Sequence, residues 1–239
     1  LKDIEVVFVG YGIEAPEQNW DDHKGYDVKG KILLMLNDDP PSDDPTFFGG
    51  QGRTYYGRWT YKFEIAARKG AVGAIILHTT PSAGYPFQVW QGSWSREQFD
   101  LEGDASAPLK LKGATSEDAT KRYITLAGYD LSKLQLDATQ KSFKPVPLGI
   151  KLSANMNVSA RRLETRNVVG ILRGNDPELS KQYVVFSAHH DHLGVGRPVD
   201  GDSIYNGALD NASGLSMMLN MARAFSSMNP KPGRSLVFA

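Results

Sequence analysis

The order of strand, helix and strand near the end of the chain restricts the fold more than any other feature. Residues 183–188 have the β-branched and aromatic composition of a strand, and residues 235–239 begin another. Between them, residues 213–228 repeat apolar side chains at helical spacing, with Asn211 or Ser213 able to cap the helix. This order predicts an open α/β sheet in the second part of the chain.

The first part of the chain, residues 1–150, is predicted to be β-rich with few helices. Its strands are predicted at 4–9, 31–36 and 72–77, its helices at 61–69, from 116 onward and at 130–139, and further strands follow at 148–158 and 167–172. Residues 37–58 are rich in Asp, Pro and Gly, which predicts a long surface loop. Residues 79–107 show no clear period. The fold class expected is therefore α/β, with a β-rich first part.

Composition excludes several functions. The chain has 27 Lys and Arg against 27 Asp and Glu, so it has no basic field for nucleic acid. It contains no Cys, which rules out disulfides, thiolate zinc sites and a Cys nucleophile. No apolar run approaches the roughly 20 residues that cross a bilayer, so we expect no membrane span. A metal site in this chain would have to use His, Asp and Glu.

The densest group of metal-binding residue types is A-H-H-D-H-L-G at 188–194, where the strand 183–188 ends. Ligands of open α/β sheets bind at that carboxyl edge. If the strand persists, His189 and Asp191 point the same way, so the carboxylate could hold the imidazole of a metal ligand. The alternative is a solvated His-rich loop.

A second motif, N-G-A-L-D-N-A-S-G at 206–214, places Asp210 at the entry to the following helix. An ordinary crossover would bring it to the same sheet edge as His189, where its two oxygens could bridge two metal ions. The alternative is that Asp210 and Asn211 only cap the helix and complement its dipole. The sequence has no G-x-S-x-G elbow, phosphate loop or dinucleotide fingerprint, so metal-assisted hydrolysis is also favoured by elimination.

Together with R-S-L-V-F-A at 234–239, the two motifs resemble the bacterial di-zinc aminopeptidase family. Its relatives include glutamate carboxypeptidase and the catalytically silent transferrin receptor. The resemblance implies that His189 binds one zinc, that Asp191 orients it, and that Asp210 bridges two zinc ions. It also implies that His190 and His192 line the site without binding metal.

The first part resembles a protease-associated domain, the β-rich insertion of such peptidases. The segments that carry this resemblance are V-K-G-K-I-L-L at 28–34 and Y-K-F-E-I-A-A-R-K-G-A-V-G-A-I-I-L-H at 61–78. It implies a protease-associated domain over 1–148 and the N-terminal part of a catalytic domain over 149–239. For Trp90 and Trp94, packing is favoured over a substrate role.

The chain departs from the family pattern at its end. In the family, the strand matching 235–239 runs into a Glu-Glu pair that supplies the general base and a zinc ligand, followed by an Asp or Glu and a last His. A catalytic zinc usually takes three protein ligands, whereas this chain offers one terminal ligand and one bridge. We therefore expect a truncated chain, also because it starts at Leu1, that binds zinc poorly and is inactive alone.

The resemblance implies a zinc-dependent exopeptidase, an aminopeptidase that removes N-terminal residues of peptides with a di-zinc-bound hydroxide. It implies a peptide substrate, two zinc ions per complete site, and a periplasmic or extracellular location. Three alternatives remain open: a non-catalytic relative, a protein-interaction module built on the protease-associated domain, and, among enzymes, a carboxypeptidase or glutaminyl cyclase.

Overall fold

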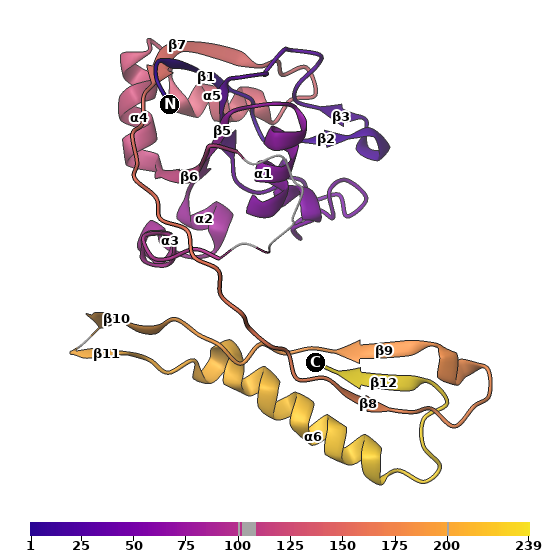
Figure 1. Ribbon diagram of the computed structural model, residues 1–239. Helices are drawn as coiled ribbons and strands as arrows, with labels where there is room; N and C mark the ends of the chain where they lie inside the picture. Colours follow the sequence, from indigo (N-terminus) through magenta and orange to yellow (C-terminus); the bar gives the residue numbers. More distant parts are fainter. Residues whose placement is uncertain (100, 102–108, 200) are drawn as a thin grey trace. The chain divides into compact units, whose positions relative to one another are not determined.

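The chain forms two compact units, Leu1–Asn157 and Val158–Ala239, each with its own sheet (Figure 1). The computed structural model describes residues 1–99, 101, 109–199 and 201–239. The division into domains 1–148 and 149–239 stays a prediction. The mixed α/β class expected from the sequence is confirmed.

The first unit is built on a five-stranded sheet of order β6-β5-β4-β1-β7. Its strands are β1 (Ile4–Phe8), β4 (Ile32–Leu36), β5 (Gly73–His78), β6 (Leu111–Ser116) and β7 (Val146–Leu152), and a short hairpin joins β2 (Glu14–Ala15) to β3 (Trp20–Asp21). Four strands run parallel, and β7 pairs antiparallel with β1. The three strands predicted near the start are confirmed, whereas β7 ends at Leu152 rather than at 158.

The central strand β4 is buried along its whole length, so the sheet is covered on both faces. Ile32 and Leu34 belong to one apolar cluster, and Leu33 and Met35 belong to another. The helices that cover the sheet are α1 (Trp59–Arg68), α2 (Thr80–Ala83), α3 (Phe87–Trp94), α4 (Glu117–Leu126) and α5 (Leu131–Ala138). The first cluster takes in side chains of α4 and α5, and the second takes in Trp90 of α3.

Two of these helices, α2 and α3, were not predicted, because α2 has only four residues and α3 carries Gly92 in a stretch without a clear period. Thr79 and Ser82 form a capping box at the start of α2. Trp90 is buried and stacks on Trp94 with ring centroids 4.6 Å apart, which confirms the packing role expected for both. Residues 100 and 102–107 of the expected irregular stretch lie outside the described residues. None of the helices that the structure describes could cross a membrane, given their length and polarity.

The second unit has a three-stranded sheet of order β8-β12-β9 and one long helix (Figure 1). Its elements are β8 (Gly170–Leu172), η3 (Leu179–Lys181), β9 (Tyr183–Phe186), β10 (Gly194–Val199), β11 (Asp202–Tyr205), η4 (Ala208–Ala212), α6 (Ser213–Ser227) and β12 (Ser235–Phe238). β12 runs parallel to β9 and antiparallel to β8. Phe225 of α6 stacks on Phe186 of β9 at 6.1 Å, so α6 packs against the sheet as a crossover helix.

The side-chain cap expected for α6 is not formed. The helix starts after Ala212, and neither Asn211 nor Ser213 caps it. Ser213 instead donates from its hydroxyl to the carbonyl oxygen of Leu209 at 2.7 Å. The preceding helical turn η4 occupies the position where a capping residue would lie, and the amide of Ala212 donates to the carbonyl of Gly207 at 3.0 Å.

A buried lysine ties the loop 37–58 to the sheet. Lys62 of α1 is fully buried, and its amino group donates to the carbonyl oxygens of Tyr11 at 2.7 Å and Asp38 at 3.0 Å. Burial lowers the pKa of Lys62, while the carboxylates of Asp22 and Asp39 act in the opposite direction. Since Asp38 lies in the loop and Tyr11 follows β1, one ammonium group holds together three segments of the unit.

We expect Lys62→Met to lower the free energy of unfolding of the first unit by about 3 kcal/mol, because it leaves the carbonyls of Tyr11 and Asp38 without their donor. All four tryptophans of the chain lie in residues 1–157, so tryptophan fluorescence during urea unfolding follows this unit alone. Lys121→Met on the exposed side of α4 is the control and should leave the midpoint unchanged. Equal effects of the two variants would contradict the role assigned to Lys62.

An aromatic cage surrounds a buried histidine at the end of β5. The ring of His78 lies 5.5 Å from those of Tyr85 and Phe87 and 6.5 Å from that of Trp90. Its Nε2 is buried and makes no hydrogen bond to any residue that the structure describes. Burial lowers the pKa of His78 below its usual value, so the folded unit favours the neutral ring.

Burial of His78 should therefore cost the first unit stability on acidification, and His78→Phe should remove this contribution to the dependence on pH. Between the lowered folded pKa and the ordinary value of about 6.5, the unfolded chain binds more protons, so the stability present above pH 6.5 falls as the pH falls. Urea midpoints by tryptophan fluorescence at pH 7.5, 6.5 and 5.5 measure the slope, with His190→Gln in the other unit as control. Identical slopes for His78→Phe and the wild-type chain would contradict this account.

Candidate metal centre

The topology of the second unit brings both predicted motifs to one sheet edge. His189 lies just beyond the carboxyl end of β9, and Asp210 lies in the turn η4 that leads into α6. Because β12 is parallel to β9, the connecting helix α6 must begin near the carboxyl end of β9 and return along the sheet. Residues that are far apart in sequence therefore meet at the edge where open α/β sheets bind ligands.

Two of the predicted site residues, Asp191 and Asp210, both contact the third, His189. The Nε2 atom of His189 lies 3.1 Å from Oδ1 of Asp210. On the other side of the ring, Nδ1 lies 2.9 Å from the main-chain oxygen of Asp191 and 3.5 Å from its Oδ1. All three side chains are exposed, at 53% for His189, 83% for Asp191 and 71% for Asp210. The site is an open surface rather than a buried pocket.

The main-chain contact of His189 determines which ring nitrogen is free. A carbonyl oxygen only accepts hydrogen bonds, so Nδ1 must carry the proton that it donates to Asp191. In the neutral ring, Nε2 then has a lone pair and faces the carboxylate oxygen of Asp210. The two atoms lie 3.1 Å apart, so both can serve as donors to one metal ion.

The contact between Asp191 and His189 differs from the one expected. Alternation along a continuing strand was expected to aim the carboxylate of Asp191 at His189, but β9 ends at Phe186. The turn that follows instead presents the carbonyl of Asp191 to the ring at hydrogen-bond distance, with the carboxylate farther away. The main-chain oxygen of Asp191 therefore fixes the tautomer of His189, and the identity of residue 191 does not reveal this contact.

A glycine that sequence reasoning did not single out lets the two motifs approach. Gly207 has a φ of +67°, a backbone conformation that residues other than glycine rarely adopt. A Cβ there would lie 2.8 Å from Cβ of His192 and 3.0 Å from the carbonyl oxygen of Asp210. The Gly of N-G-A-L-D could have indicated this close approach from the sequence. His192, expected to line the site, thus packs on the Asp210 motif, and His190 is exposed.

The donor set fits part of a zinc site. An imidazole with a free Nε2 and an opposed carboxylate are common zinc ligands, and the tautomer is the one that metal binding needs. Among the residues that the structure describes, no group of three or more His, Asp and Glu side chains is arranged to hold a metal ion. His189 and Asp210 can therefore supply two ligands, one fewer than the usual protein contribution to a catalytic zinc.

A donor pair of this kind at the carboxyl edge of an α/β sheet is typical of metallohydrolases, and comparison with known proteins agrees. Residues 167–239 match the model of peptidase family M28, whose members are generally zinc-dependent. This confirms the resemblance inferred from the two motifs, and His189, Asp191 and Asp210 all lie in the matched segment.

Two relatives share similarity over most of this chain. A glutamate carboxypeptidase 2 homolog of Caenorhabditis elegans is 24% identical over 286 aligned positions, which cover 98% of this chain and 32% of the relative. The corresponding protein of Caenorhabditis briggsae is 26% identical, with coverage of 90% and 30%. The chain thus spans about a third of the length of these relatives. No solved structure matches it at a significant level.

We expect the chain to keep less than one zinc ion after dialysis, because two exposed donors bind zinc weakly. His189→Ala and Asp210→Ala should each lower the remaining zinc affinity about tenfold or more, whereas Asp191→Asn should lower it less because its carbonyl still holds the ring. Elemental analysis and competition with a zinc indicator give the stoichiometry and affinity.

His190→Gln provides the matched control, since it removes an exposed imidazole next to the site. It should bind zinc as the wild-type chain does. Two tightly held zinc ions, or an equal loss in the control, would show that the ligands are assigned wrongly.

Proposed function

We propose that this chain provides part of the active site of a zinc-dependent exopeptidase, an aminopeptidase acting on peptides. His189 is proposed as a zinc ligand, Asp210 as the carboxylate that bridges two zinc ions, and Asp191 as the residue that positions His189. The observation that carries the proposal is the 3.1 Å approach of His189 Nε2 to Asp210 Oδ1 within a segment that matches an M28 peptidase model.

Each residue has a defined task in this proposal. The carbonyl oxygen of Asp191 accepts a hydrogen bond from Nδ1–H of His189, which keeps Nε2 available. Asp210 offers two oxygens on a turn held by the hydrogen bond from Ala212 to Gly207. Zinc, when bound, would polarise the scissile carbonyl and lower the pKa of a water molecule.

The ligand count supports a further part of the proposal. A catalytic zinc commonly takes three protein ligands, and peptide hydrolysis also needs a general base. The pair His189 and Asp210 falls short of this set. We therefore propose that turnover requires additional groups and that this chain is inactive by itself.

We also propose that residues 1–148 are a protease-associated domain and that the protein is periplasmic or extracellular. The first proposal is supported by the order of the glycine-containing segments at 28–34 and 61–78. The second rests on the family resemblance together with the absence of Cys.

A second candidate activity is carboxypeptidase action on peptides with a C-terminal glutamate. It is favoured by the names of both relatives, which are glutamate carboxypeptidase 2 homologs. The two activities differ in the chain end that the site must recognise, a free amine in one case and a carboxylate in the other. The same metal chemistry serves both.

Assays of the complete gene product containing this chain distinguish these activities. We expect hydrolysis of aminoacyl-anilides that stops on chelation and returns with zinc, and a loss of at least a hundredfold in kcat/KM for His189→Ala and Asp210→Ala. His190→Gln should stay near the wild-type rate.

Release of glutamate from N-blocked peptides without anilide cleavage would select the carboxypeptidase. Cleavage that resists chelators would contradict both candidates. Absence of any zinc-dependent hydrolysis by the complete protein would favour the non-catalytic relative or the interaction module.

A further inference from the structure

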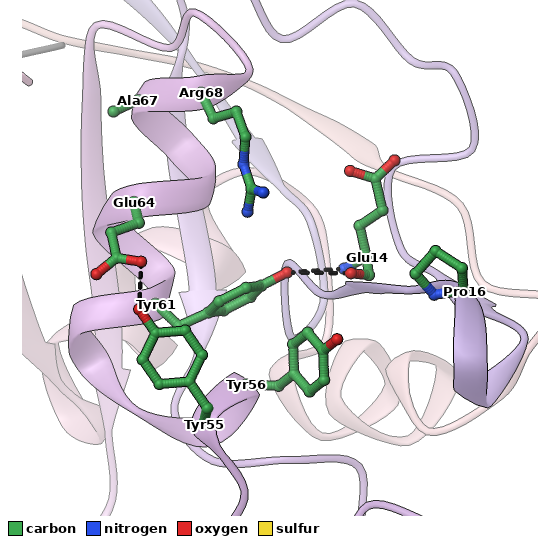
Figure 2. A pocket seen from close by; sticks show the side chains of 8 residues that line it. All are labelled: Glu14, Pro16, Tyr55, Tyr56, Tyr61, Glu64, Ala67 and Arg68. Atoms are coloured by element: carbon green, nitrogen blue, oxygen red, sulfur yellow. Dashed lines mark hydrogen bonds between the residues drawn. The ribbon is translucent and has the colours of Figure 1, made fainter. Parts of the chain in front are cut away.

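The first unit contains an open pocket of about 590 Å³ that lies outside the site described above. Its lining comes from β2, the 3-10 helices η1 (Pro16–Gln18) and η2 (Tyr55–Gly57), and α1, and it comprises Glu14, Pro16, Tyr55, Tyr56, Tyr61, Glu64, Ala67 and Arg68 (Figure 2). The volume falls within the range of small-molecule sites, roughly 300–1,000 Å³.

Three tyrosine rings form a rigid apolar wall. The ring of Tyr61 lies 5.7 Å from that of Tyr55 and 5.0 Å from that of Tyr56, both edge to face. Tyr61 also accepts a hydrogen bond at its hydroxyl from the amide of Glu14 at 3.1 Å. Because their partners fix these rings, a ligand would lose little free energy in ordering them.

The carboxylates around the pocket already have partners. Glu14 pairs with Lys69 at 2.9 Å, and Glu64 accepts a hydrogen bond from the hydroxyl of Tyr55 (Figure 2). Glu17, beside the pocket, accepts from the hydroxyl of Tyr56 at 2.6 Å, which raises the pKa of Tyr56 to about 12. The tyrosine hydroxyls thus remain protonated at neutral pH and keep their donors turned toward these acids.

Arg68 is different. Figure 2 shows its side chain extending from α1 into the space bounded by the tyrosines and Glu14. No hydrogen bond or ion pair joins its guanidinium to another residue in the described part of the chain. A guanidinium offers five donors in a planar fork that matches a carboxylate. The pocket therefore combines an unused carboxylate-binding group with aromatic walls.

We propose that this pocket binds a carboxylate whose neighbouring group is aromatic or aliphatic, as at the C-terminal end of a peptide. Arg68 receives the carboxylate in two hydrogen bonds, and Tyr55, Tyr56 and Tyr61 pack against the apolar part. A free aromatic carboxylic acid presents the same chemistry. The proposal concerns the first unit and does not depend on the metal centre.

Glu64 provides a second test because its carboxylate lines the same pocket, where it is hydrogen-bonded to Tyr55 rather than to Arg68. A negative charge beside the pocket repels a bound carboxylate. Removing the Glu64 charge should therefore strengthen binding of a carboxylate. If the pocket instead bound an amine through its carboxylates and tyrosine rings, removing the Glu64 charge should weaken binding.

Isothermal titration of the whole chain with N-acetylphenylalanine tests the proposal, with N-acetylphenylalanine amide and phenethylamine as matched probes. We expect the acid to bind at least tenfold more tightly than the amide. Arg68→Gln should lose at least tenfold in affinity for the acid, Arg68→Lys should lose less, and Glu64→Gln should gain. Arg122→Gln, on the exposed side of α4, should leave the affinity unchanged.

An N-acetylated tetrapeptide ending in phenylalanine identifies the source of the carboxylate. Tighter binding than N-acetylphenylalanine indicates a peptide end, and equal binding indicates a free acid. Tryptophan fluorescence unfolding of each variant confirms that the first unit is folded. Equal binding of acid and amide, preference for the amine, or wild-type affinity in folded Arg68→Gln would overturn the proposal.

Discussion

The parallel pairing of β9 with β12 is the constraint on which the candidate metal centre depends. Two adjacent parallel strands need a crossover, and α6 supplies it. The crossover must start at the carboxyl edge of β9, so the loop carrying His189 and the turn carrying Asp210 meet there. The stacking of Phe186 on Phe225 holds the helix against the sheet and thereby keeps the two motifs together.

The first unit is organised by a different constraint, the burial of β4 on both faces. A strand with apolar residues on each side needs a covering layer on each side, and the helices of this unit provide both. The helix α1 contributes to this unit in three ways. Its apolar residues belong to both clusters, and Lys62 is buried and donates to the carbonyl of Asp38 in the loop 37–58. Arg68 lines the tyrosine pocket. One helix thus links the core of this unit to the tyrosine pocket.

The elements predicted best are those whose side chains repeat over many residues. The helix α6 and the buried strands β1, β4 and β5 were all expected near their observed bounds, because burial of one face imposes a period that local sequence reveals. The helices α2 and α3 were missed, since α2 has only four residues and α3 carries Gly92 in a stretch without a helical period. The side-chain cap of α6 was expected at Asn211 or Ser213 but is absent, because the turn η4 precedes the helix.

By itself, the sequence determined which residues could form the metal centre and which family they resemble, because donor types and their spacing are local properties. It singled out His189, Asp191 and Asp210 as candidates, and the family resemblance agrees with the match over 167–239. Only the tertiary structure decided that the carbonyl of Asp191 holds His189, that Gly207 admits His192, and that Arg68 meets three tyrosines in one pocket. These contacts depend on backbone direction and on segments distant in sequence, and neither is encoded in the identity of a single residue.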